Sequence, residues 1–261
     1  MSKLAGVLKR HKKIFAPFIT AGDPDLETTK KLILAMEEAG ATLIELGIPF
    51  SDPMAEGPVI QEADLRALSA GCTTDKVFDM IKEVREETDI PLVFLTYANP
   101  IFHYGTDKFY ARCAEVGVDG TIVPDVPYEE RGELEAACEK YGVDRITMIA
   151  PTSDDRIREI ARDAKGYVYI VSSLGVTGVR SEITTDIGTI YRKIREVTDT
   201  PAAVGFGISK PEQAAEMARL SDGAIVGSAI VKIVAEYGKD SVEPVREYVK
   251  KMVEAVAHCE D

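Results

Sequence analysis

Residues 14–48 read IFAPFITAGDPDLETTKKLILAMEEAGATLIELGI and contain one complete strand–helix–strand unit. Ile14–Thr20 and Thr42–Ile48 are short runs rich in apolar and β-branched residues, so each is expected to be a strand buried on both faces. Leu26–Ala39 lies between them with helical spacing of its apolar residues, and Asp25 stands where an N-cap is expected. The stretch therefore predicts two parallel strands joined by a crossover helix.

The same alternation continues along the rest of the chain. The other expected strands are Leu92–Thr96, Gly120–Pro124, Arg145–Ile149, Tyr167–Val171, Ala202–Phe206 and Gly223–Val226. The other expected helices are Lys76–Arg85, Thr106–Val116, Tyr128–Tyr141, Asp154–Ala164, Thr185–Val197, Lys210–Arg219 and Val242–His258, with an extra helix in residues 1–13. Eight strand–helix units in 261 residues predict an α/β fold, a single (β/α)8 TIM barrel domain over residues 1–261 with an extra N-terminal helix. A doubly wound open sheet is the alternative, but its GxGxxG fingerprint does not follow the first expected strand.

The charge of the chain excludes several classes of partner. There are 44 acidic and 31 basic residues, which gives a net charge of −13. Nucleic acid and anionic membranes would repel such a chain, so neither is expected as a partner. The longest stretch without Asp, Glu, Lys or Arg, Ile90–Thr106, is too short and contains two prolines, so no membrane span is expected. No apolar block follows the basic residues near the start of the sequence, so no signal peptide is expected.

The metal-ligating residues are few and scattered. The four cysteines are Cys72, Cys113, Cys138 and Cys259, and the three histidines are His11, His103 and His258. No two of them have the spacing of a zinc site, so neither a metal nor a disulfide framework is expected. Scattered reduced thiols are typical of a cytoplasmic protein.

Glycine turns follow the seventh and eighth expected strands. A barrel carries its chemistry at the C-terminal ends of its strands, and phosphate sites often lie in these two loops. Gly207 and Gly227 allow backbone N–H groups to approach an anion, and Ser228 adds a hydroxyl donor. Neither turn contains Lys or Arg, so a phosphate would depend on backbone donors. Tight turns without a ligand are the alternative.

Glu45 is the only charged residue inside the second expected strand. Alternation places Ile44 and Leu46 on the face that helices must cover, so Glu45 points into the barrel. A buried carboxyl group without a cation has a raised pKa, which suits proton transfer near neutral pH. A structural ion pair is the alternative, and Arg145 is the strand residue that could serve as its partner.

Two loops on the same rim add further candidates. Residues 49–58 contain three prolines, so this loop is stiff and presents two more carboxylates, Asp52 and Glu56. The loop after the sixth strand, residues 172–180, is longer than most βα loops and contains Gly175 and Gly178 as candidate hinges of a lid. A surface excursion without function is the alternative for the second loop.

Seven motifs in order along the chain resemble those of the tryptophan synthase alpha chain family. They are FITAGDPD (18–25), LIELGIPFSDPMAEGPVIQ (43–61), YANP (97–100), DVP (125–127), SSLGVTG (172–178), GFGIS (205–209) and VGSAIV (226–231). The resemblance implies a lyase that splits indole-3-glycerol phosphate into indole and D-glyceraldehyde 3-phosphate by a retro-aldol reaction, with no metal or organic cofactor. It also implies an α2β2 heterotetramer in which a β chain receives the indole for tryptophan biosynthesis.

The resemblance also implies roles for individual residues. The catalytic carboxylates would be Glu45 and Glu56, the phosphate site Gly178, Gly207, Gly227 and Ser228, and the indole pocket Phe18, Leu95, Phe206 and Ile225. The loop with Pro49 and Asp52 would face the β chain. From alternation we further expect Tyr169 to point inward and orient Glu45, and Thr177 on the lid to bond Glu56 or Asp52 on closure.

One position departs from the family pattern. The family carries Asp where this chain has Glu56, which moves the carboxyl group one methylene further from the backbone. Because a shift of about 1 Å can cost roughly a hundredfold in rate, the loop is set back to compensate, the enzyme is slower, or Asp52 takes part of the role. We favour compensation.

Other phosphate-binding barrels remain as alternatives. Indole-glycerol-phosphate synthase needs a lysine inside a strand, ribulose-phosphate epimerase needs metal-binding histidines, and the expected strands contain neither. Phosphoribosyl isomerases share the glycine turns. A non-catalytic phosphate-binding subunit that activates a partner is the third reading, and the change at Glu56 gives it some support.

Overall fold

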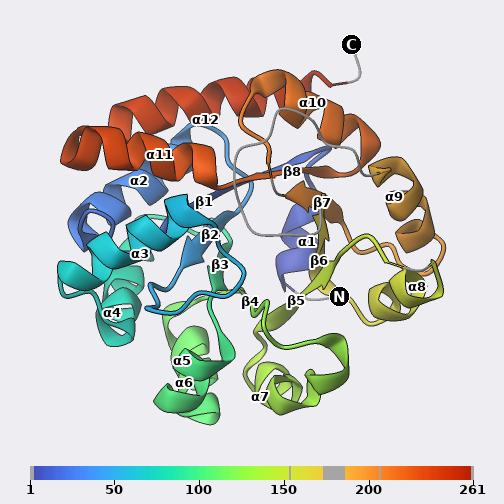
Figure 1. Cartoon of the computed structure of the whole chain (residues 1–261), viewed down its shortest axis with the longest axis horizontal. Coiled ribbons are helices and arrows are strands. Elements are labelled where there is room, and N and C mark those ends of the chain that lie inside the picture. Colours follow the sequence, from blue (N-terminus) through green and yellow to red (C-terminus); the bar gives the residue numbers. More distant parts are fainter. Residues whose placement is uncertain (1–2, 153, 173–185, 206, 260–261) are drawn as a thin grey trace.

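Eight parallel strands close into a barrel in the computed structural model, which describes residues 3–152, 154–172, 186–205 and 207–259. Each strand pairs with its neighbours in chain order, and β8 returns to β1 with Ile14 opposite Gly223 (Figure 1). The strands are β1 Ile14–Thr20, β2 Ile44–Gly47, β3 Leu92–Leu95, β4 Gly120–Ile122, β5 Asp144–Ile149, β6 Lys165–Val171, β7 Ala202–Gly205 and β8 Gly223–Val226. The predicted closed barrel is confirmed, and the open sheet is excluded.

Helices surround the barrel (Figure 1). They are α1 Lys3–Leu8, α2 Leu26–Glu38, α3 Pro58–Ser69, α4 Thr74–Val84, α5 Ala98–Tyr104, α6 Thr106–Val116, α7 Gly132–Tyr141, α8 Asp154–Arg162, α9 Ile187–Arg195, α10 Pro211–Leu220, α11 Ser228–Tyr237 and α12 Val242–Ala257, with 3-10 turns η1 Tyr128–Glu130 and η2 Gly238–Asp240. None of the helices in the described parts of the chain is long and apolar enough to cross a membrane.

Three of these helices were not predicted, namely α3, α5 and α11. Each lies in the loop after a strand, where the sequence analysis expected only irregular backbone or turns. In α3, Pro58 occupies the first turn, where its missing N–H costs nothing, and Ile60, Ala63 and Ala67 form the buried face. The single helix expected over residues 128–141 is instead the short turn η1 followed by α7.

The side chains of the strands separate into an inner and an outer layer. Ile44 and Leu46 belong to the outer cluster, which packs against the helices, whereas Val93 and Tyr167 belong to the cluster inside the barrel. Leu4 and Leu8 of α1 belong to that inner cluster too. The predicted N-terminal helix therefore closes the barrel floor, at the N-terminal end of β6, and leaves the opposite end for the site.

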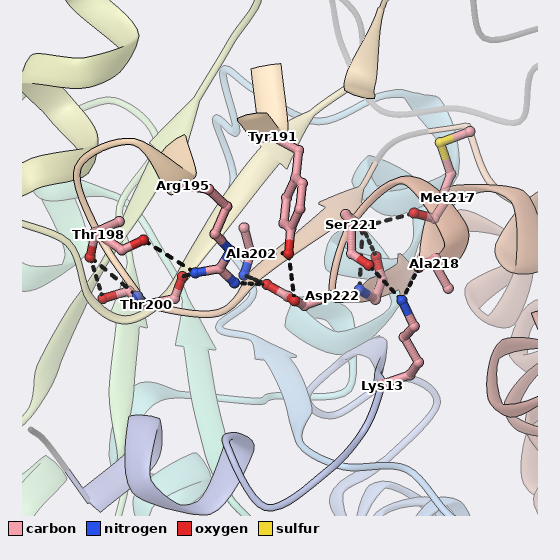
Figure 2. A network of polar contacts seen from close by, with 11 residues as sticks. Lys13, Tyr191, Arg195, Thr198, Thr200, Ala202, Met217, Ala218, Ser221 and Asp222 are labelled. Atoms are coloured by element: carbon pink, nitrogen blue, oxygen red, sulfur yellow. Dashed lines mark hydrogen bonds and ion pairs between the residues drawn. The ribbon is translucent and has the colours of Figure 1, made fainter. Parts of the chain in front are cut away.

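A polar network ties α9 to the N-terminal ends of β7 and β8 (Figure 2). Asp222 accepts hydrogen bonds from the Ala202 N–H and the Tyr191 hydroxyl, both at 2.8 Å, and also forms an ion pair with Arg195. Lys13, just before β1, donates to the Ala218 carbonyl at 2.6 Å, near the end of α10. Because these groups lie at the end of the barrel away from the predicted chemistry, their role is to hold strands and helices together.

Candidate active site

A cavity opens among residues at the C-terminal ends of the strands. Its lining includes residues from widely separated parts of the sequence, which barrel closure brings together. It is lined by Phe18, Glu45, Glu56, Ile60, Leu95, Tyr169, Gly207, Ile208, Ile225, Gly227 and Ser228. The structure thus gathers both predicted carboxylates, both described glycine turns and three of the predicted indole-pocket residues around one space.

Glu45 is the most buried charged group in this cavity, with 1% of its surface exposed. Its β2 position lies beside Phe18 of β1 and Val93 of β3 in the strand register. Burial raises the pKa of Glu45 to about 8, and a hydrogen bond from Tyr167 opposes the rise. A carboxyl group with such a pKa is mostly protonated at neutral pH and is able to give up its proton.

The inner wall of the barrel supplies the hydrogen bond to Glu45. The Tyr167 hydroxyl donates to Oε1 of Glu45 at 2.5 Å, from β6 to β2. We predicted Tyr169 for this role, and it does point inward and line the cavity, but the structure places the Tyr167 hydroxyl on the carboxyl group. Sequence alternation put both tyrosines on the inner face and could not choose between them.

The arginine that could have been a structural partner of Glu45 lies elsewhere. Arg145 alternates along β5 with Ile146, which belongs to the inner cluster, so the Arg145 side chain leaves the outer face of the strand. It lines a separate cavity together with Tyr128 and Arg156. Glu45 is therefore not neutralised by that guanidinium.

Glu56 reaches the cavity from the loop before α3 and is 5% exposed. Burial raises its pKa, while side-chain hydrogen bonds with Asp64 and Tyr97 oppose the rise. Oε2 of Glu56 is buried and receives no hydrogen bond from an N–H or O–H group of the described residues. That oxygen is an acceptor still open to a substrate donor or a proton.

The glycine turns form the opposite side of the cavity. Gly227 precedes the N-terminus of α11, whose first residue is Ser228, so free N–H groups of this helix face the same space. Gly207 has a φ of +78°, which favours glycine over other residues. No lysine or arginine is among the described residues of the lining, so an anion here would be held by backbone N–H groups and the Ser228 hydroxyl.

A close approach explains the glycine before the first of these turns. A Cβ on Gly205, at the end of β7, would lie 2.1 Å from the Tyr169 hydroxyl oxygen. Any side chain at this position would therefore displace the tyrosine from the cavity wall. Gly205 is the first residue of the GFGIS motif. At this position the motif serves side-chain packing and not ligand binding.

The loop over residues 49–57 presents different residues to the surface and to the interior. Pro49 is buried, whereas Asp52 and Met54 are exposed. The Phe50 and Tyr97 rings lie 5.6 Å apart, and the Tyr97 hydroxyl accepts a hydrogen bond from the Ala55 N–H at 3.2 Å. These contacts hold the loop against α5 and so position Glu56.

Some predicted site residues lie outside the described residues. They are Phe206 of the indole pocket, Gly178 of the phosphate site, and Thr177 with the rest of the expected lid from residue 173 to residue 180. Among the residues that are described, no group of three or more His, Cys, Asp and Glu side chains is arranged to hold a metal ion.

Four residues of the site were missed by sequence reasoning. Ile60 and Ile208 line the cavity, and the helical spacing after Pro58 was a signal for the first of them. Tyr97 stands in the YANP motif but was given no role. Asp64 looks in the sequence like an ordinary helix-surface acid, and nothing local marks it as buried.

Comparison with known proteins agrees with this geometry. The sequence profile described as "Tryptophan synthase alpha chain" matches residues 4–259. The chain is 50% identical over 256 residues to the tryptophan synthase alpha chain of Lacticaseibacillus casei, covering 98% of this chain and 96% of that one. It is 46% identical over 255 residues to that of Alkaliphilus metalliredigens, with 97% and 96% covered.

Solved structures give the same answer. Tryptophan synthase subunit alpha from Legionella pneumophila superposes with a TM-score of 0.88 at 37% identity, covering 98% of both chains. A chain of the tryptophan synthase α2β2 complex from Pyrococcus furiosus superposes with a TM-score of 0.82 at 35% identity, covering 93% of this chain and 98% of that one. The chain belongs to the tryptophan synthase alpha chain family, whose known role is the retro-aldol cleavage of indole-3-glycerol phosphate.

Proposed function

We propose that this chain cleaves indole-3-glycerol phosphate to indole and D-glyceraldehyde 3-phosphate, with Glu45 as the acid and base and Glu56 as the acceptor of the indole N–H. One observation carries the proposal. Glu45 is a buried carboxyl group without a neutralising cation among its described contacts, and it shares a cavity with the glycine turns. The cavity thus offers a proton donor and an anion site to one small molecule.

The first step is protonation of the indole ring. Indole is a poor leaving carbanion, so Glu45 gives its proton to C3, and the ring becomes a cationic indolenine. The C–C bond then breaks as the neighbouring hydroxyl loses its proton to the Glu45 carboxylate and becomes the aldehyde. The bonding electron pair returns to the ring, which regains its aromatic form. Glu45 ends the cycle protonated, so no net proton is consumed.

Glu56 acts on the opposite side of the ring. Positive charge develops at the indole nitrogen when C3 is protonated, and an ionised carboxylate beside the N–H stabilises it. The open Oε2 of Glu56 supports this role. Phe18, Leu95 and Ile225 supply apolar surface for the ring between the two carboxyl groups.

The phosphate of the substrate occupies the turns at Gly207 and Gly227. Backbone N–H groups and the N-terminus of α11 attract negative charge without a side-chain cation. They can therefore hold a phosphate dianion even in a chain of net charge −13. Binding there fixes the distance between the phosphate and the reacting carbon, which lies next to Glu45.

A tryptophan synthase β chain is the proposed partner. The P. furiosus structure with the same fold is described as an α2β2 complex. In this chain Met54 is 77% exposed and Phe102 is 49% exposed, on the loop before α3 and on α5. Large apolar side chains exposed near one rim are typical of a protein interface. The cytoplasmic location is likewise proposed, since the four cysteines are free and buried.

The test is to incubate the purified chain with indole-3-glycerol phosphate, with and without a β chain, and to measure indole. We expect indole in both reactions, and Glu45→Gln to reduce the rate about 10²–10⁴-fold. Glu236→Gln, on the exposed surface of α11, is the matched control. No indole with either preparation would overturn the proposed activity, and an active Glu45→Gln would overturn only the role of Glu45.

A further inference from the structure

Two carboxyl groups lie together behind the cavity wall. Glu56 lines the cavity, whereas Asp64, two turns into α3, does not and is only 3% exposed. The two carboxyl groups lie close enough for a side-chain hydrogen bond between them. Asp64 therefore contacts a proposed catalytic residue without itself facing the substrate.

A hydrogen bond between two carboxyl groups requires a proton. An ionised carboxylate only accepts, so two ionised groups would have no donor between them and would repel each other. In a buried setting that repulsion is screened weakly, and one group stays neutral. The pair thus carries one proton and one negative charge at neutral pH.

The surroundings decide which group holds the proton. Tyr97, beside Glu56, favours the charged form of Glu56, whereas the negative charge of Asp23 disfavours charge on Asp64. The Phe50 N–H, which also faces Asp64, works in the opposite direction. Burial, followed by the charge of Glu56, raises the pKa of Asp64 well above its ordinary value.

The arginine on the same helix as Asp64 does not neutralise the pair. Arg66 lies on the same helix as Asp64, but its guanidinium binds Asp23 through two hydrogen bonds of 2.8 Å. Asp23 is itself buried, so this ion pair uses the Arg66 charge. Among the described residues named here, a proton between the carboxyl groups therefore balances them.

We propose that Asp64 is a positioning residue which, as a neutral acid, donates a hydrogen bond to Glu56 and fixes its carboxylate for the indole N–H. The proposal rests on the proposed function. It also accounts for the departure at this position: Glu has one more rotatable bond than the Asp of the family, and a donor on α3 restrains it. This compensation comes from a second acid.

The first experiment compares the rates of Asp64→Asn and Asp64→Ala with wild type. The Asn amide still donates to Glu56, so we expect kcat within about threefold of wild type at neutral pH. Ala has no donor, so kcat is expected to fall about thirtyfold with a smaller change in KM. Ser69→Ala, at the exposed end of α3, is the control. Equal loss of kcat in both Asp64 variants would overturn the proposal.

The pH profile separates a shared proton from a merely structural contact. Wild type loses two protons at high pH, from Glu45 and then from Asp64, so log kcat/KM is expected to fall with a limiting slope of about −2. In Asp64→Asn only Glu45 titrates, so the slope is expected to be about −1. Slopes that are the same in both proteins would overturn the proposal.

Infrared spectroscopy tests the proton without any substrate. A neutral carboxylic acid has a C=O stretch that a carboxylate lacks. At neutral pH this signal should decrease in Asp64→Asn and should also decrease, independently, in Glu45→Gln. No decrease in Asp64→Asn, with thermal unfolding showing a folded protein, would overturn the proposal. Because no activity is measured, failure of the proposed function would leave this result interpretable.

Discussion

The Tyr167 hydroxyl lies 2.5 Å from Oε1 of Glu45 and donates a hydrogen bond to it across the interior of the barrel. The two residues are 122 positions apart in the sequence, on β6 and β2. The phenol stabilises the charged form of Glu45, while burial stabilises the neutral form. Their balance gives a pKa of about 8, at which a carboxyl group both donates and accepts a proton near neutral pH.

Tyr167→Phe should disturb this balance. Loss of the hydrogen bond removes the contact that favours the carboxylate, so the pKa of Glu45 rises and the alkaline limb of kcat/KM moves to higher pH. We also expect kcat to fall roughly tenfold, because Glu45 is held less firmly. Tyr237→Phe, on the exposed end of α11, is the control. An unchanged pH profile would show that Tyr167 does not tune Glu45.

Glu45→Gln should alter the pH dependence of stability. The folded pKa of Glu45 is raised from 4.5 to about 8, so its contribution to stability is full below the unfolded pKa and is lost as pH rises towards the folded one. Between about pH 5 and about pH 8 the unfolding free energy of wild type should fall more than that of Glu45→Gln, by up to ~4 kcal/mol. Urea unfolding at both pH values measures the difference, and parallel curves would contradict the assignment.

Glu56→Asp and Glu56→Ala test the departure from the family pattern. Asp keeps the charge but retracts the carboxyl group from Asp64 and from the indole N–H, so we expect a loss of roughly tenfold in kcat. Ala removes the acceptor, and a loss of at least about a hundredfold is expected. Steady-state formation of indole measures both. Equal activity in wild type and the two variants would show that the position is not catalytic.

Ser228→Ala should weaken binding of the phosphate. A hydrogen bond to a charged group contributes about 1.5–3 kcal/mol, so KM should rise by roughly ten- to a hundredfold with little change in kcat. Calorimetric titration with glycerol 3-phosphate measures the same loss without catalysis, and Ser69→Ala is again the control. If Ser228→Ala binds this ligand as tightly as wild type, the phosphate does not contact Ser228.

Asp222→Asn should affect stability and leave catalysis alone. Asp222 accepts from Tyr191, from the Ala202 N–H and from Arg195 at the end of the barrel away from the cavity (Figure 2). Loss of its charge leaves the half-buried guanidinium of Arg195 with a weaker partner, and we expect a destabilisation of about 2–4 kcal/mol. Urea unfolding measures it against exposed Asp199→Asn. A lower unfolding free energy with an unchanged KM would agree, whereas a changed KM would place this network in the active site.

The sequence by itself determined the barrel, the inward direction of Glu45 and the region of the site. These follow from local periods: alternate residues of a strand face opposite sides, and eight such strands joined by helices have one compact arrangement. These periods alone place Glu45, Gly207 and Gly227 on one rim. The helices α3, α5 and α11 were missed because each follows a strand within a segment that the strand–helix alternation assigned to a loop.

Only the tertiary structure decided which side chains touch. Tyr167, not Tyr169, holds Oε1 of Glu45, because strand tilt and stagger set which of two inward residues on β6 meets β2. Asp64 is buried beside Glu56 because it lies on the buried face of α3, with Ile60, Ala63 and Ala67, and no period in the sequence distinguishes such an acid from a solvated one. Direction along a strand or helix is a local property, whereas contact between distant segments depends on how the whole barrel closes.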